Sequence, residues 1–128
     1  MMNLLSKICW IGAVLYAVAG MVFGIVMSAS GDHSLSPAHA HLILLGWVTL
    51  ALYGTFYTLC AEATKTWVAR IQVALAHLGV LVLTPGIVLA IQGRSETPAK
   101  VGAVIVLMSM LLFATVVFTQ PTRSAKSA

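Results

Sequence analysis

The sequence predicts an all-α membrane protein built as a bundle of four transmembrane helices. Hydrophobic residues make up 60% of its 128 residues and charged residues only 8%, whereas a soluble domain carries roughly 25% charged residues. The chain contains four apolar segments, each near the ~20 residues needed to cross a ~30 Å hydrocarbon core. We therefore expect one membrane domain over residues 1–128, with spans at about 8–28, 39–60, 67–91 and 101–119.

The first span follows Lys7 and resembles a signal peptide, with small residues at 17–19 as a cleavage site. We expect it to be retained as a membrane span. Small residues recur along it at spacings of four and three, which lets helix backbones approach closely in lipid. This stripe is either a dimerisation face or ordinary packing within the bundle, and we expect the latter. Its members are Ala13, Ala17, Gly20 and Gly24.

Prolines mark the second and third spans. Pro37 is placed to begin the second helix, because its missing N–H costs nothing in a first turn. Pro85-Gly86 should kink the third helix or loosen its hydrogen bonding. The polar segment 92–98 separates the third span from the fourth.

Basic residues near the span ends predict the orientation, because cytoplasmic loops carry an excess of Lys and Arg. Two basic residues, Arg94 and Lys100, lie on one side. Five lie on the other, so both termini should be cytoplasmic in a multi-pass protein of the bacterial inner membrane. We attribute the net charge of +4 to this orientation and expect no nucleic-acid partner. The five are Lys7, Lys65, Arg70, Arg123 and Lys126.

Two histidines, His39 and His41, stand one residue apart at the outer end of the second span. Ionisable groups at membrane depth are functional suspects, because lipid does not solvate them. Residues at i and i+2 on a helix point about 200° apart, so this pair suits two neighbouring sites better than one shared ion. The alternative is that both rings are hydrated at the interface.

Helical periodicity places His39 on one face with Gly46, where a flat macrocycle would lie close to the backbone. Tyr53 and Tyr57 follow on the same face, and we expect them to make hydrogen bonds between helices. The face of His41 carries Leu45 and three residues beyond it, Val48, Leu52 and Thr55.

His77 lies ten residues into the third span, about 15 Å deep and roughly 10 Å from the level of His41. We therefore do not expect His41 and His77 to share an ion. Arg70, His77 and Thr84 follow heptad spacing and predict a polar stripe. His77 is either hydrogen-bonded inside the bundle, or a second metal ligand or part of a proton route. His33, in the outer loop, receives no role.

The run from Pro37 to His41, followed by Gly46, resembles the catalytic subunit of haem–copper oxidases and nitric oxide reductases. That family has twelve spans in three pseudo-repeats of four around three pores, with both termini cytoplasmic. One of its helices carries a His-x-His pair whose members ligate haems in adjoining pores. The resemblance implies that this chain forms a homotrimer, in which each pore collects His39 from one protomer and His41 from its neighbour.

The resemblance implies a redox protein that binds haem b, or alternatively copper, and serves in electron transfer, sensing or the handling of O₂ or NO. The chain lacks a separate copper-ligand helix and a His-His dipeptide, so whether it is an enzyme stays open, as does its redox partner. The competing hypothesis is a non-catalytic helical bundle that acts as an assembly partner or small transporter component.

Overall fold

A computed structural model describes residues 1–122 of the protein. Four helices in it are long and apolar enough to cross a membrane, and residues 1–122 contain no strand. The second of them, Ser36–Leu59, combines two α-helical parts with a π-helical segment between them. The elements are α1 (Leu4–Ser30), α2 (Ser36–His41), the π-helical η1 (Leu42–Thr49), α3 (Leu50–Leu59), the 3₁₀-helical η2 (Ala61–Lys65), α4 (Trp67–Ile91) and α5 (Thr97–Thr119).

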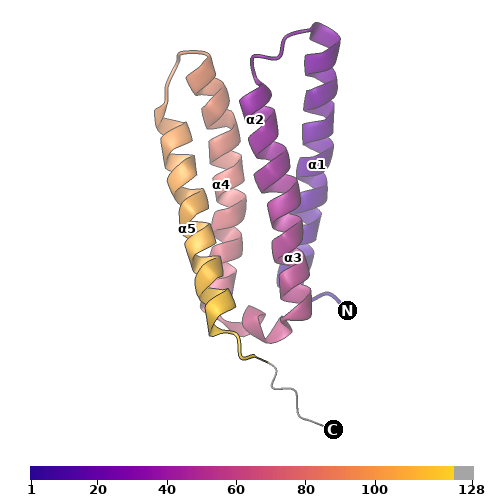
Figure 1. The fold of residues 1–128 in the computed structure, drawn as a ribbon, viewed down its shortest axis with the longest axis vertical. Helices are drawn as coiled ribbons and strands as arrows, with labels where there is room; N and C mark the ends of the chain where they lie inside the picture. The colour runs from indigo at the N-terminus through magenta and orange to yellow at the C-terminus, as the bar shows by residue number, and fades with distance from the viewer. Residues whose placement is uncertain (123–128) are drawn as a thin grey trace.

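The helices run up and down, as predicted, and the N-terminus, η2 and the end of α5 lie at one end of the bundle (Figure 1). We call this the terminal end, and we call the other the loop end, because the connections 31–35 and 92–96 lie there. Of the basic residues used to predict orientation, Arg123 and Lys126 lie outside the described residues.

Two helices begin about one turn earlier than the apolar pattern predicts. α1 begins at Leu4 because the side chain of Asn3 accepts a hydrogen bond from the Ser6 N–H and caps the helix. α5 begins at Thr97, with a proline in its first turn. Hydropathy misses both turns because they contain polar residues. Pro37 lies in the first turn of α2, as predicted.

α4 and α5 pack closely because glycines stand where their backbones meet. A Cβ on Gly86 would lie 2.5 Å from the Ala99 nitrogen, and one on Gly102 would lie 2.5 Å from the Leu83 Cα. α4 continues through Pro85 to Ile91. The Pro85-Gly86 pair lies where α4 contacts the first turn of α5, because Gly86 faces the backbone of Pro98 and Ala99.

α1 and α5 expose their outer faces, which carry long rows of aliphatic side chains. Soluble proteins rarely expose so continuous an apolar surface, and lipid is its natural solvent. The small residues of α1 instead face inward: Ala13 is fully buried, and a Cβ on Gly20 would clash with Ile43 of η1. The small-residue stripe therefore packs within the bundle, as expected.

A buried polar network joins three helices near the terminal end. The Tyr57 hydroxyl donates to Gln72 Oε1 at 2.9 Å, and Gln72 Nε2 donates to Ser109 Oγ at 3.1 Å. Ser109 Oγ in turn donates to the Gln72 carbonyl at 2.9 Å. Phe113 of α5 packs edge-on against the Tyr57 ring. The predicted role of Tyr57 in a hydrogen bond between helices is confirmed.

Candidate histidine sites

His41 ends the short helix α2, and its side chain is exposed on the outside of the protomer. Its Nδ1 lies 2.7 Å from the carbonyl oxygen of Pro37, one turn earlier. A carbonyl only accepts, so Nδ1 donates its proton to Pro37, and Nε2 has no hydrogen-bond partner among the described residues. Metal-binding histidines are typically held in this way, with the second ring nitrogen donating to a backbone carbonyl.

His39 packs inward against α1. Its ring meets Phe23 edge-on, with centroids 5.8 Å apart, and a Cβ on Gly24 would lie 3.2 Å from its Cε1. Its Nδ1 is buried and has no hydrogen-bond partner among the described residues. One imidazole of the pair therefore lies inside the protomer and the other outside it.

Gly46 does not leave the space that the sequence suggests. A Cβ there would lie 2.7 Å from the Tyr16 Cβ and 2.8 Å from its Cγ. The expectation that Gly46 lets a flat macrocycle approach the backbone is wrong within one protomer, because Tyr16 of α1 occupies that volume.

The predicted His39 face is also divided between neighbours. Gly46 faces α1, whereas the Tyr53 ring packs 4.5 Å from that of Phe113 on α5. The face was predicted from 3.6 residues per turn, but η1 closes i→i+5 turns, so residues beyond it are rotated relative to His39.

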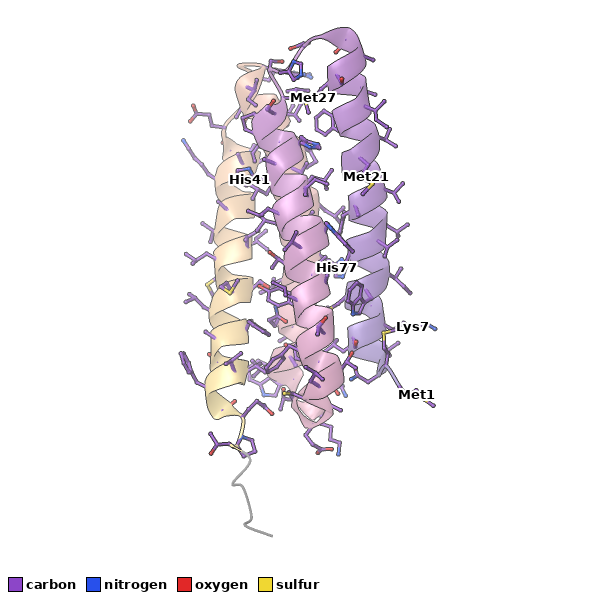
Figure 2. All side chains as sticks on the ribbon, turned by 45° about the vertical axis from the view of Figure 1, so that its right-hand side comes forward. Met1, Lys7, Met21, Met27, His41 and His77 are labelled. Carbon is purple, nitrogen blue, oxygen red and sulfur yellow. The ribbon has the colours of Figure 1, made fainter. Side chains whose placement is uncertain are left out.

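His77 faces α1 and fills the space beside Gly12, where a Cβ would collide with the ring. The Tyr16 hydroxyl lies 3.3 Å from His77 Nδ1. His77 Nε2 is buried without a hydrogen-bond partner among the described residues, although the Ile8 carbonyl lies near the ring. Figure 2 shows His77 deeper in the bundle than His41, as the sequence predicts.

The predicted stripe of Arg70, His77 and Thr84 faces α1 along its length. Arg70 lines a cleft with the first turn of α1, and Thr84 lines a groove of about 250 Å³ with Tyr16 and Ala19. Arg70 and Thr84 thus line hollows beside α1, one on each side of the Tyr16–His77 pair along α4.

Within residues 1–122, no group of three or more His, Cys, Asp or Glu side chains lies close enough to hold a metal ion. A metal site of three such ligands built on His41 would therefore need ligands from further copies of the chain.

His33 lies in the loop after α1, where Nδ1 is 3.2 Å from the Gly31 carbonyl. Asp32 beside it accepts a hydrogen bond from the Ser34 N–H at 2.9 Å, and this bond lowers the pKa of Asp32.

Tyr16 is the site residue that sequence reasoning missed. It is linked to His77 by a hydrogen bond and to Gly46 by packing. A signal was present, because a tyrosine in the middle of a long apolar helix needs a polar partner and His77 lies at a similar depth. The sequence did not identify His77 as the partner of Tyr16, because the two residues are 61 positions apart.

Known proteins offer no guide to these histidines. Comparison of the chain with protein-family models, curated proteins and solved structures gives no match.

Proposed function

We propose that the protein is a membrane-embedded redox protein that binds haem b, or alternatively copper, through His41 in an assembly of several copies. Electron transfer, sensing, or the handling of O₂ or NO are the roles that such a centre serves. The observation that carries the proposal is the geometry of His41: an exposed imidazole with Nδ1 bonded to Pro37 and Nε2 free.

This geometry fits a metal ligand better than a structural histidine. His41 lies at the outer end of its span, and among the described residues its exposed ring has a partner for Nδ1 and none for Nε2. The bond to the Pro37 carbonyl holds the ring and leaves Nε2 as the nitrogen available to a ligand. A bound haem or copper would supply one-electron chemistry, while the chain orients the ligand.

Several copies are needed to complete the site, and the proposed assembly is a homotrimer. If haem b is the cofactor, His41 of one protomer and His39 of its neighbour would hold it, since two imidazoles suit a low-spin haem. His39 must then turn away from Gly24, against which it now packs. With copper, His41 from three symmetry-related copies is an acceptable set of donors, and His39 stays where it is.

The test is an absorption spectrum combined with metal analysis of protein purified in detergent. A Soret band identifies haem, and copper without that band identifies the alternative. His41→Ala should remove the metal in either case, whereas His33→Ala, a change at an exposed loop histidine, should retain it. A His41→Ala protein with a full complement of metal would refute the site.

His39→Ala separates the two cofactors. It removes haem if His39 is an axial ligand, and it leaves copper in place if three copies of His41 hold the metal. His77→Ala should retain the metal in both cases, because the ring is enclosed between α4 and Gly12 of α1.

The competing function is a non-catalytic bundle that serves as an assembly partner or small transporter component. The observation that favours it is the filled interior, since Tyr16 occupies the space at Gly46. A colourless wild-type protein that assembles without stoichiometric metal would establish this alternative.

The proposed orientation has both termini in the cytoplasm of a bacterial cell, with His41 at the outer surface. It is supported by Lys7, Lys65 and Arg70, which lie in the first turn of α1, in η2 and in the first turn of α4, all at the terminal end.

A further inference from the structure

At the terminal end, the first turn of α1, η2 and the first turn of α4 border an open cleft of about 440 Å³. Leu4 and Leu5 of α1 line one side, and Thr64 of η2 and Arg70 of α4 line the other. Deeper along the same two helices, His77 packs on Gly12 and closes the seam. The cleft is therefore a pocket at the membrane surface.

Arg70 has no carboxylate to neutralise it. The whole chain contains three Asp or Glu residues. Asp32 and Glu96 lie in the connections at the loop end, and Glu62 forms its ion pair with Lys65 at 2.8 Å. The guanidinium of Arg70 thus faces the cleft with its charge uncompensated by any side chain of the described residues.

The lining changes from polar to apolar across the cleft. Arg70 supplies hydrogen-bond donors, and the Thr64 hydroxyl, which donates to the Ala61 carbonyl at 2.7 Å, adds polar surface. Leu4, which is 74% exposed, supplies apolar surface. Trp67, one turn before Arg70, is 68% exposed, and exposed tryptophans at span ends sit at the level of lipid headgroups. A phospholipid matches this lining, because its polar phosphate lies next to an apolar acyl chain.

We propose that this cleft binds one anionic phospholipid, with its phosphate on Arg70 and its acyl chain along Leu4 and Leu5. Guanidinium groups bind phosphate with two parallel hydrogen bonds, and basic pockets between membrane helices suit anionic headgroups. The lipid thus bridges the first turn of α1 and the first turn of α4 across the cleft.

Native mass spectrometry of protein taken from vesicles tests the proposal. Protein from mixed phosphatidylglycerol and phosphatidylcholine vesicles should retain one phosphatidylglycerol per chain. Arg70→Gln should lower this occupancy about fivefold, the factor expected for one basic group near an anionic surface. Arg94→Gln is the matched control, since Arg94 is exposed at the loop end, and it should leave the occupancy unchanged.

Two further arms separate the lipid from its phosphate. Arg70→Lys keeps the charge but loses the paired hydrogen bonds, so its occupancy should fall between those of wild type and Arg70→Gln. Inorganic phosphate should not displace the retained lipid, because it lacks the chain that covers Leu4 and Leu5.

Three results would overturn the proposal. They are equal retention by wild type and Arg70→Gln, no preference for phosphatidylglycerol over phosphatidylcholine, and displacement of the lipid by inorganic phosphate. The circular dichroism melting curve of Arg70→Gln serves as the folding control. It should match that of Arg94→Gln in lipid-free detergent, because Arg70 is exposed and makes no ion pair within residues 1–122.

Discussion

His77 packs against Gly12 of α1, a contact that the sequence did not predict. Its ring occupies the volume that a side chain on Gly12 would take, and the Tyr16 hydroxyl meets Nδ1 one turn further along α1. This contact satisfies one ring nitrogen and fits the structural role proposed from the sequence. The buried Nε2 is the part of the ring that the contact leaves unexplained.

Gly12→Ala tests this contact. The added Cβ overlaps the His77 ring, so the free energy of unfolding should fall by about 1–3 kcal/mol, the usual cost of overpacking. Denaturant unfolding in mixed micelles measures the loss. Gly12→Ala should cost much less when it is made in a His77→Ala background, and an equal loss in the two backgrounds would show that the two residues do not compete for space.

Glu96 and Lys100 form an exposed pair at the start of α5, 2.8 Å apart. The hydrogen bond from Lys100 lowers the pKa of Glu96, and its positive charge adds to the effect. A lowered folded pKa stabilises the folded state at pH above the ordinary carboxyl pKa, and the contribution is lost as the pH falls through the folded pKa. The effect on stability should be small, because the pair is exposed.

NMR titration of Glu96 checks this direction. Its pKa should lie below that of an ordinary glutamate, and Lys100→Gln should return it upward toward that value. An unchanged pKa in Lys100→Gln would mean that Lys100 is not the cause.

At the scale of elements, η1 is the feature that apolar periodicity did not reveal. A π-helical segment of eight residues is rare, and such segments are frequent at functional sites. The Thr49 hydroxyl donates to the Leu44 carbonyl, five residues earlier, at 2.8 Å. This segment sets the angle between the His39–His41 pair and the buried tyrosines of α3.

Gly86→Ala should separate α4 from α5. The new Cβ would meet backbone atoms of Ala99 and Pro98 at 2.5 and 2.7 Å, and backbone cannot yield as a side chain can. We expect a loss of about 2–3 kcal/mol in the free energy of unfolding.

Gly24→Ala is the matched control for Gly86→Ala, because its Cβ would meet only the His39 ring at 3.2 Å. It should cost less than about 1 kcal/mol. Thermal unfolding in detergent ranks the two, and equal losses would mean that the α4–α5 backbone contact is not tight.

At the scale of the whole molecule, the bundle separates its surface by chemistry. The outer faces of α1 and α5 are aliphatic, the polar network of Tyr57, Gln72 and Ser109 is enclosed, and charges lie near the two ends. This distribution suits insertion across a membrane, and the proposed orientation puts the basic residues of the terminal end on the cytoplasmic side.

Cysteine labelling in intact cells tests that orientation. In a Cys60→Ser background, Ser34→Cys should react with a membrane-impermeant maleimide, because residue 34 lies in the connection after α1 at the loop end. Ala61→Cys, exposed at the terminal end, should react only after the cells are opened. The native Cys9 should stay silent, because it is fully buried. The reverse pattern would place both termini outside.

The sequence alone determined the four spans, the helix start at Pro37 and the polar stripe on α4, because hydropathy, proline chemistry and spacing act locally. The fold decided which groups meet: Tyr16 at Gly46, His77 at Gly12, and Arg70 across from Leu4. In a membrane both the lipid-facing and the inward-facing sides of a helix are apolar, so periodicity carries little information about the partner. The close approaches depend on glycines and rings far apart in the chain, and only the packed bundle brings them together.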